Sequence, residues 1–441
     1  MVIAYKIVMD KIHIKQMILA DDLTGANDTG VHFLPNSSRV MVIVDAQVDT
    51  FPELAETTVI NTDTRFLSPK DAYKKIHDIM GIFISYQPNH IYKKIDSTLR
   101  GNIGSEIDAL MDVTNYSLTC VASASPRNGR TVRDGLCYVH GELITDTEIA
   151  HDPFNPVTSS SILEVLTTQT TRKIGLLLLS EIRSPLSEGY AKLESLVTGG
   201  AEIIVTDAES AEDLRKVKQL FAMLSDPVLF VGSAGLFHAV NNNSDQFTYK
   251  KPTPLFCIKD YPNILFVIGS LMDTTLQQVE YLCHQQDVAN YKITTEELLK
   301  ADNDLAIGSS AKEIAKGFRK SSIVLMKTDR MQVDKPATAI QIGNALGSLV
   351  YAVMKLVEID VLVVTGGDTA KNVLKKIQVN SFELIDEVLP GVPMARIRRH
   401  TDDKMVLFVT KAGSYGDLDA LFRVVEYMEE ESNQSNKEEG V

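Results

Sequence analysis

The sequence predicts an α/β protein of two domains, each a largely parallel β-sheet flanked by helices. The 441 residues exceed what one hydrophobic core usually organises, and 44% hydrophobic with 23% charged residues is ordinary for a globular protein. Short runs rich in Val, Ile and Leu alternate with amphipathic stretches of helical length, the pattern of parallel strands covered by helices. A polar, Asn-rich stretch near the middle of the chain separates two such series and predicts a linker.

The expected strands are the runs rich in Val, Ile and Leu. In the first half they lie at 14–20, 39–45, 57–61, 90–95, 118–123, 173–179, 201–206 and 227–232, and in the second half at 263–269, 321–327, 360–367 and 404–410. Helices are expected between some of them, for example over 71–84 and 187–197.

The domain boundaries follow changes in composition. The expected parts are an N-terminal extension at 1–13, a first domain at 14–240, a linker at 241–260, a second domain at 261–428 and a disordered acidic tail at 429–441. The linker is rich in Asn, polar residues and Pro, which neither continue a helix nor bury a face. The tail is charged, polar and poor in aromatic residues.

Charge and cysteine spacing exclude several classes of protein. The chain has 44 Lys and Arg against 58 Asp and Glu, a formal charge of -14, so broad binding to nucleic acid or an anionic membrane is not expected. The cysteines form no CxxC pair and the histidines no HxxxH or HExxH pair, so neither disulfides nor a protein-ligated metal is predicted. Residues 1–16 do not read as a signal peptide and no run is long enough to span a bilayer, so a cytoplasmic protein is expected.

The first candidate site is ILADDLTGANDTG at 18–30, where a buried strand runs into Asp21 and Asp22. Open parallel sheets bind ligands at the carboxyl ends of their strands, so a carboxylate here is placed to accept a proton or to hold a metal-linked water. Asp and Thr are also favoured helix caps, and capping alone explains this segment about equally well.

The second candidate site is KKIDSTLRGNIGSE at 93–106, which concentrates cations, hydroxyls and a carboxylate before a Gly-containing loop. Alternation along the strand puts Lys93 and Lys94 on opposite faces, so only one is expected to point into a cleft, and Lys94 shares its face with Asp96. Cationic donors beside hydroxyls such as Ser97 suit a carboxylate or phosphate. A solvated charged turn is the competing interpretation.

Arg65 follows another expected strand, in NTDTRF at 61–66. A guanidinium at this position is a candidate to clamp a carboxylate with two parallel hydrogen bonds. The alternative is an ordinary surface arginine.

Three junctions in the second half carry glycine where a phosphate-binding loop needs it. They are VIGSLMDTT at 267–275, VVTGGDTAKN at 363–372 and VTKAGSYGDLD at 409–419. Glycine lets the backbone approach an anion, and a following helix favours negative charge at its first turn. None matches the Walker A or GxGxxG patterns, and each glycine alone is more often structural, but three in one domain favour a nucleotide site.

Several segments together resemble the four-carbon acid sugar kinase family. These are ILADDLTGANDTG, NTDTRF, KKIDSTLRGNIGSEI, SPRNGRTVRDGLCYVHGELITDT followed by DPFNP, VIGSL, TGGDTA and KAGSYGD, in this order along nearly the whole chain. The resemblance implies an amino-terminal domain that holds a sugar acid, a carboxyl-terminal domain that holds ATP, and an active site in the cleft between them. The implied reaction is phosphorylation of the terminal C4 hydroxyl. TGGDTA and TKAGSYG imply D-threonate as the acceptor, giving 4-phospho-D-threonate.

The resemblance also implies site residues. It assigns the sugar acid to Asp22, Arg65, Lys94, Ile95, Asp96 and Ser97, and ATP to Ser270, Gly366, Gly367, Asp368, Thr369 and Gly413. Asp22 is the candidate proton acceptor, with Asp96 as its rival. Mg²⁺ is expected with ATP, organised by Asp368 through water.

Other functions stay open at this point. The alternatives within the family are a D-erythronate or 3-oxo-tetronate 4-kinase, and the alternative of another class is a non-catalytic sugar-acid sensor. The expected partners are therefore a small sugar acid and ATP, with no nucleic acid and no membrane. A homodimer is the default expectation for a metabolic enzyme.

Overall fold

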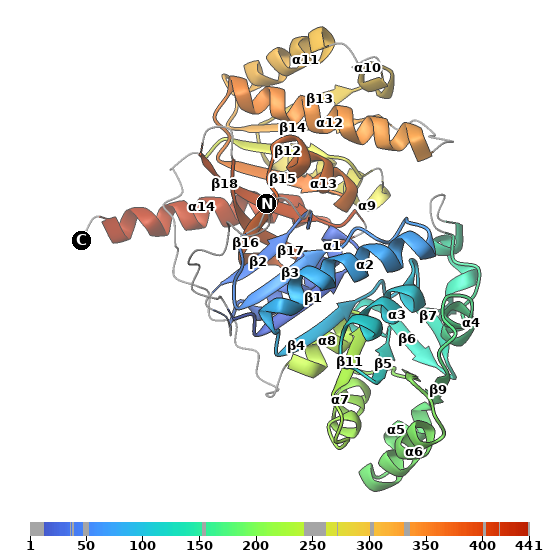
Figure 1. Cartoon of the computed structure of the whole chain (residues 1–441). Coiled ribbons are helices and arrows are strands. Elements are labelled where there is room, and N and C mark those ends of the chain that lie inside the picture. The colour runs from blue at the N-terminus through green and yellow to red at the C-terminus, as the bar shows by residue number, and fades with distance from the viewer. Residues whose placement is uncertain are drawn as a thin grey trace, which may run out of the picture. The chain divides into compact units, whose positions relative to one another are not determined.

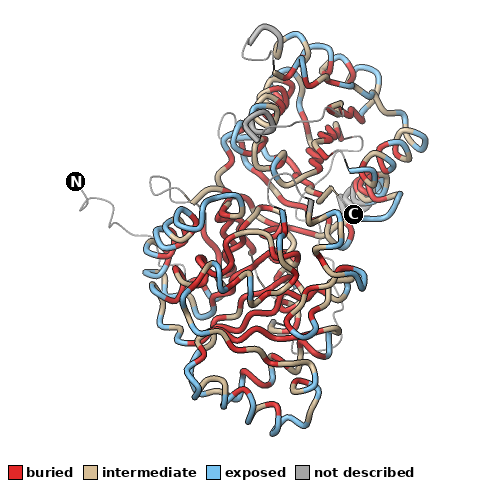
Figure 2. Tube along the Cα trace, turned by 90° about the vertical axis from the view of Figure 1, so that its right-hand side faces the viewer, coloured by how far each residue is buried: buried red, intermediate tan, exposed pale blue. Residues whose placement is uncertain are grey.

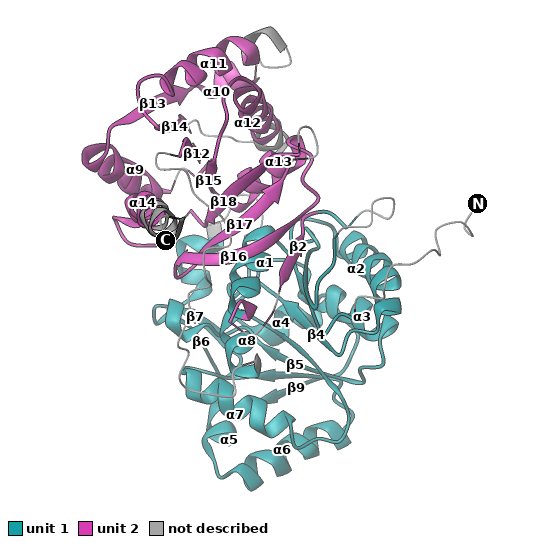
Figure 3. Cartoon of the chain, turned by 90° about the vertical axis from the view of Figure 1, so that its left-hand side faces the viewer, with its two compact units in different colours: residues 1–32, 45–248 teal, residues 33–44, 249–441 magenta. Residues whose placement is uncertain are grey.

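The computed structural model describes most of the chain (Figure 1). The described residues are 13–35, 37, 39–46, 53–151, 156–241, 262–270, 272–299, 304–329, 336–399, 403–413 and 415–439. The chain divides into two compact units, residues 1–32 with 45–248 and residues 33–44 with 249–441 (Figure 3). No helix within the described ranges is long and apolar enough to cross a membrane.

The first unit is built on a parallel sheet. Its strands are β1 (Gln16–Ala20), β3 (Thr57–Asn61), β4 (His90–Lys94), β5 (Leu118–Ala122), β9 (Ile174–Leu177), β10 (Ile203–Thr206) and β11 (Val228–Gly232). They lie in the order β3-β1-β4-β11-β5-β10-β9, and every neighbouring pair is parallel. Ala20 pairs with Asn61 and with Lys94, so the carboxyl ends of β1, β3 and β4 meet at one edge of the sheet.

Helices pack on this sheet in two groups. They are α1 (Leu23–Gly30), α2 (Pro69–Phe83), α3 (Ile103–Val113), α4 (Ile162–Thr167), α5 (Leu179–Arg183), α6 (Leu186–Thr198), α7 (Ala211–Phe221) and α8 (Ala234–Asn241). One group runs from α2 through α3 to α4, and the other from α1 through α8 and α7 to α6. With both faces covered, β1, β3 and β5 are almost wholly buried (Figure 2). The α/β class predicted from the sequence is confirmed.

A small antiparallel sheet and short 3₁₀ turns complete the first unit. The sheet consists of β6 (Arg130–Arg133), β7 (Leu136–Val139) and β8 (Glu142–Leu143), and the turns are η1 (Val31–Phe33), η2 (Ile84–Tyr86), η3 (Pro126–Asn128), η4 (Ile144–Asp146) and η5 (Glu148–His151). Asp134 and Gly135, with φ of 54° and 71°, form the two-residue turn between β6 and β7. Asp-Gly suits this turn because both positions need positive φ.

The second unit has a parallel sheet with an antiparallel extension. Its strands are β2 (Val40–Ile43), β12 (Ile264–Ile268), β13 (Val288–Ile293), β14 (Ile323–Thr328), β15 (Val361–Thr365), β16 (Ser381–Leu389), β17 (Val392–Arg398) and β18 (Met405–Lys411). The order is β13-β14-β12-β15-β18-β17-β16-β2, parallel from β13 to β18 and antiparallel from β18 to β2. The helices are α9 (Asp273–Gln285), α10 (Thr295–Leu299), α11 (Asp304–Gly317), α12 (Pro336–Leu356), α13 (Gly367–Lys376) and α14 (Ala420–Glu439).

Two boundaries differ from the sequence prediction. The sequence predicts the strand at 39–45 as part of the first domain, but β2 belongs to the second unit because it pairs with β16. The expected disordered tail at 429–441 is helical as far as Glu439, as the end of α14. The N-terminal extension up to residue 12 and nearly all of the linker at 241–260 lie outside the described residues.

Candidate active site

Asp22 lies at the carboxyl edge of the first-unit sheet, directly after β1. It is the N-cap of α1, and its Oδ1 accepts a hydrogen bond from the Gly25 amide at 2.8 Å. A Cβ on Gly25 would lie 2.7 Å from Asp22 Oδ1 and 3.1 Å from Lys94 Nζ, so this face of α1 is kept bare for the two side chains. Capping and proximity to a cation therefore coexist at Asp22.

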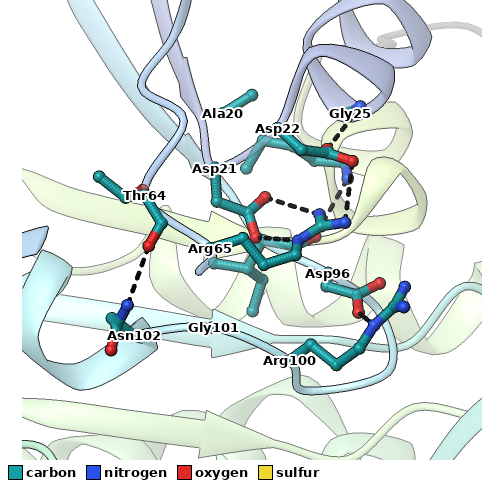
Figure 4. A network of polar contacts seen from close by, with 12 residues as sticks. Ala20, Asp21, Asp22, Gly25, Thr64, Arg65, Asp96, Arg100, Gly101 and Asn102 are labelled. Atoms are coloured by element: carbon teal, nitrogen blue, oxygen red, sulfur yellow. Dashed lines mark hydrogen bonds and ion pairs between the residues drawn. The ribbon is translucent and has the colours of Figure 1, made fainter. Parts of the chain in front are cut away.

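Arg65 is bound by two carboxylates from the end of β1 (Figure 4). Its Nε and NH2 donate to the two oxygens of Asp21 at 2.8 and 3.0 Å, and its NH1 donates to Asp22 Oδ2 at 2.8 Å. Burial acts to raise the pKa of Asp21, but the attraction of Arg65 outweighs it and leaves that pKa below its usual value. The bidentate clamp predicted for Arg65 is thus made to Asp21, and Arg65 fixes the orientation of Asp22.

Lys93 and Lys94 contact different helices, as alternation along β4 predicts. Lys93 is fully buried and forms an ion pair of 2.5 Å with Glu106 of α3. Lys94 Nζ lies over Gly25 of α1 and donates to the Ile95 carbonyl at 3.0 Å. No described carboxylate lies within 4.0 Å of the Lys94 ammonium, which has three N–H donors and uses one of them among the described residues. Lys94 is therefore the cation best able to bind an anionic ligand.

Asp96 organises the loop that follows β4. Its Oδ2 accepts from Thr98 Oγ1 at 2.5 Å and from Arg100 Nε at 2.6 Å. Although burial opposes ionisation, Arg65 and Arg100 hold the pKa of Asp96 far below its usual value. Leu99 adopts a φ of 63°, which non-glycine residues rarely do, so the loop is sharply folded.

The other predicted residues of this segment differ in what they can offer a ligand. The Ile95 side chain is 1% exposed and its amide donates to Gly232, so little of it is available. Ser97, next to Asp96 in the chain, is only half-buried, so part of it is accessible to a ligand. The structure therefore brings Asp22, Arg65 and the 94–97 segment to one edge of the sheet.

The three glycine loops predicted in the second unit also meet. A Cβ on Gly269 would lie 1.9 Å from Thr369 Oγ1, and one on Gly413 would lie 2.2 Å from Ser270 Oγ. Gly366, at φ 92°, is the N-cap of α13 and approaches the Ser270 amide. Glycine is needed at 269 and 413 because a Cβ there would collide with the neighbouring loop, and at 366 because of the positive φ. Leu271 and Ser414 of the same motifs lie outside the described residues.

Lys411 is a residue that sequence reasoning did not single out. It ends β18, is 2% exposed, and its Nζ donates to the carbonyls of Ala412 and Tyr415, each at 2.9 Å. Burial lowers the pKa of Lys411 to about 8, so it is still mostly protonated at neutral pH. The sequence feature that could have identified Lys411 is a lysine as the last residue of a hydrophobic strand.

Gln278 and Thr275 of α9 hold the same loop. Gln278 Nε2 donates to the carbonyls of Tyr415, Gly416 and Asp417 at 2.9–3.0 Å, and Thr275 Oγ1 donates to the Gly413 carbonyl at 2.6 Å. Across each trans peptide of this loop, the carbonyl of one residue and the N–H of the next point in opposite directions, so the direction of a carbonyl also fixes that of the following amide.

The carbonyl contacts of this loop turn some of its amides outward. The Ala412 and Tyr415 carbonyls point toward Lys411, so the N–H groups of Gly413 and Gly416 point away from it. Within the described residues neither N–H donates a hydrogen bond to the chain. Outward amides beside the N-terminus of a helix can bind an anion.

The comparison with protein families assigns both halves of the chain. Residues 16–240 match the family described as a sugar-binding N-terminal domain, and residues 265–421 match the nucleotide-binding C-terminal domain. The chain belongs to the four-carbon acid sugar kinase family. The site of the first unit lies in the sugar-binding part of this kinase, and the glycine loops lie in its nucleotide-binding part.

Curated relatives of this kinase align over most of its length. A D-threonate kinase of Salmonella typhimurium strain LT2 is 29% identical, covering 94% of this chain and 99% of the relative. A D-erythronate kinase of Heliobacterium modesticaldum is 25% identical, covering 93% and 96%. A 3-oxo-tetronate kinase of Salmonella typhimurium is also 25% identical, covering 91% and 96%. These names support a sugar-acid kinase.

Solved structures share the fold. A Salmonella typhimurium LT2 protein, provisionally described as a tRNA synthase, aligns with a TM-score of 0.76 and 22% identity over 93% of this chain and 98% of its own. A Haemophilus influenzae protein aligns with a TM-score of 0.70 and 21% identity over 94% and 100%. At this identity the likeness concerns the fold.

Proposed function

We propose that this kinase transfers the γ-phosphoryl group of ATP to the terminal C4 hydroxyl of D-threonate, giving 4-phospho-D-threonate and ADP. The observation that carries the proposal is the ammonium of Lys94 in the sugar-binding part, which lies beside a carboxylate and bonds through one of its three donors within the described residues. D-Threonate is favoured because the relative of that name is 29% identical, against 25% for the D-erythronate and 3-oxo-tetronate kinases. ATP as the donor makes the cytoplasm the proposed location.

Asp22 is the proposed proton acceptor for the attacking hydroxyl. Its side chain is 24% exposed, against 11% for Asp96, so it is the more accessible of the two carboxylates. The low pKa of Asp96 makes it a weak base, and Asp96 instead has the role of holding the loop around Ser97. Lys94 binds the substrate carboxylate, and Arg65 contributes positive charge while it orients Asp22.

The glycine loops are the proposed site for the phosphates of ATP. Amides and hydroxyls at one end of the parallel sheet come from Ser270, Gly366, Gly367, Thr369 and Gly413. Such donors stabilise charge that spreads over the oxygens of a transferring phosphoryl group.

Mg²⁺ is the proposed metal of the reaction, and when bound it neutralises phosphate charge. Asp368 lies exposed in the first turn of α13, which fits contact through water. The described residues contain no group of three His, Cys, Asp or Glu side chains that could hold a metal. A single carboxylate that contacts the metal through water fits Mg²⁺, which usually keeps several waters and relies on phosphate oxygens.

A coupled ADP-release assay with Mg-ATP tests the proposal. The panel is D-threonate, L-threonate, D-erythronate, L-erythronate and 3-oxo-tetronate, and the highest kcat/KM is expected with D-threonate. A preference for D-erythronate or 3-oxo-tetronate would keep the kinase assignment and replace the substrate. Binding of a sugar acid without turnover of any panel member would contradict the kinase assignment for these acids.

Lys411→Met is expected to weaken nucleotide binding by about 10- to 100-fold, because buried carbonyls of the glycine loop lose their donor. Calorimetric titration with Mg-ADP measures this change, and Lys375→Met, an exposed lysine of α13, is the matched control. Binding of the sugar acid to the first unit should be unchanged. Wild-type affinity for Mg-ADP in Lys411→Met would show that this lysine does not shape the loop.

A further inference from the structure

Asp28 is a carboxylate in the sugar-binding unit that the proposed mechanism does not use. It lies in the last turn of α1 and is half-buried. No described group donates a hydrogen bond to it, and no described cation lies within the 4.0 Å of an ion pair. A partly desolvated carboxylate without a donor is unfavourable in a folded protein.

The position of Asp28 on the helix directs it toward the site. Asp28 is three residues after Gly25, so the two positions share a face of α1. Helical side chains lean back toward the helix N-terminus, and the Asp28 carboxylate therefore extends toward the Gly25 face. Lys94 Nζ lies over that face, 3.1 Å from where a Cβ of Gly25 would be. Asp28 and Lys94 thus approach one space from α1 and from the end of β4.

The charges around Asp28 agree with its placement beside Lys94. Burial raises the pKa of Asp28, and the positive charge of Lys94 is the largest effect that acts against this. Burial lowers the pKa of His32 to about 4 and that of His238 to about 3, so both imidazoles are neutral at pH 7. Their ring centroids are 3.7 Å apart, and His238 adds no charge beside Asp28 at that pH.

Stability does not explain an aspartate at this place. The last turn of a helix disfavours negative charge, and α1 has no basic residue in that turn. Aspartate also has a low helix propensity. Three unfavourable contributions to stability, from desolvation, the helix dipole and helix propensity, therefore coincide at Asp28, near a lysine that has one bonded donor among the described residues.

We propose that Asp28 accepts a hydrogen bond from a hydroxyl group of the bound sugar acid, while Lys94 donates to an oxygen of the same molecule. A hydroxy acid suits this pair because it offers both hydroxyl donors and carboxylate acceptors. The proposal rests on the proposed function and adds a substrate-binding residue to it. It makes Asp28 a residue that selects polyhydroxy acids over acids without hydroxyl groups.

Asp28→Ala and Asp28→Asn test this role. Asp28→Ala removes both acceptor oxygens and is expected to raise the Kd for D-threonate by about 10- to 100-fold, the effect of losing a hydrogen bond to a charged group. Asp28→Asn keeps a neutral acceptor and is expected to lose less. The thermal midpoint without ligand should stay equal or rise, because alanine is the better helix former and no partly desolvated carboxylate remains. Asp78→Asn, on the exposed face of α2, is the matched control.

Butyrate, a four-carbon acid without hydroxyl groups, separates the contributions of Asp28 and Lys94. Its weak binding should be unaffected by Asp28→Ala and reduced by Lys94→Met. Unchanged D-threonate affinity in Asp28→Ala would overturn the role of Asp28. A thermal midpoint low enough to explain a loss of D-threonate affinity by unfolding would overturn it as well. The kinase assignment is tested separately, because it fails if wild-type protein turns over no acid of the panel, whatever the affinity of Asp28→Ala.

Discussion

Asp22→Asn is expected to lower kcat with Mg-ATP and D-threonate by about 10²- to 10⁴-fold, the usual contribution of a positioned general base. The variant should fold, because Asn caps a helix about as well as Asp and can still accept the Gly25 amide proton. Arg65 also keeps its two hydrogen bonds to Asp21. The coupled ADP-release assay gives kcat and KM, and circular dichroism checks the fold.

Asp96→Asn is the informative comparison for this experiment. Because two arginines hold the pKa of Asp96 far below its usual value, its loss should raise KM for the acid more than it lowers kcat. A larger loss of kcat in Asp96→Asn than in Asp22→Asn would exchange the two roles. Full turnover by Asp22→Asn would remove it from the base role altogether.

Lys93→Met is expected to destabilise the first unit by about 3–5 kcal/mol, since it leaves the Glu106 carboxylate buried without its cation. For a domain of this size each kcal/mol lowers the thermal midpoint by about 2–4 °C, so a fall of about 6–20 °C is expected. Differential scanning calorimetry measures this fall. The ion pair of 2.5 Å links β4 to α3 beneath the site, where both side chains are at most 1% exposed.

Two further variants separate the pair from the lysine alone. Lys93→Met with Glu106→Leu removes both charges and should recover most of the lost stability, because buried ion pairs are often replaceable by apolar residues. Lys74→Met, at an exposed position of α2, should leave the midpoint unchanged. A midpoint for Lys93→Met equal to that of Lys74→Met would contradict a buried, uncompensated carboxylate.

Most strands could be predicted because hydrophobic runs reflect burial on both faces. The run at 57–61 is β3, and the run at 118–123 contains β5. The antiparallel strands β16 and β17 were not predicted, since they mix charged residues such as Glu383 and Arg396 with apolar ones. These two side chains form a cross-strand ion pair of 2.7 Å, a contact that a hydrophobicity pattern does not reveal.

The candidate site was predicted in its location more than in its contacts. Motifs at strand ends indicated Asp22, Lys94 and the glycine loops, because residues at the carboxyl ends of parallel strands meet at one edge. The partner of Arg65 was not predicted as Asp21, and Asp28 was not distinguished from other helical residues. The partner of Arg65 and the role of Asp28 both depend on which side chains are paired in the folded protein.

The sequence by itself determined the α/β class, the succession of parallel strands and the glycine loops, since these follow from local periodicity and from backbone freedom at glycine. Only the tertiary structure decided that β2 pairs with β16, that Lys93 is paired with Glu106 while Lys94 has no ion pair with a described carboxylate, and that Lys411 orders the loop around Gly413. The physical reason is that charge pairing and burial depend on residues far apart in the chain, and a one-dimensional pattern carries no information on their distance.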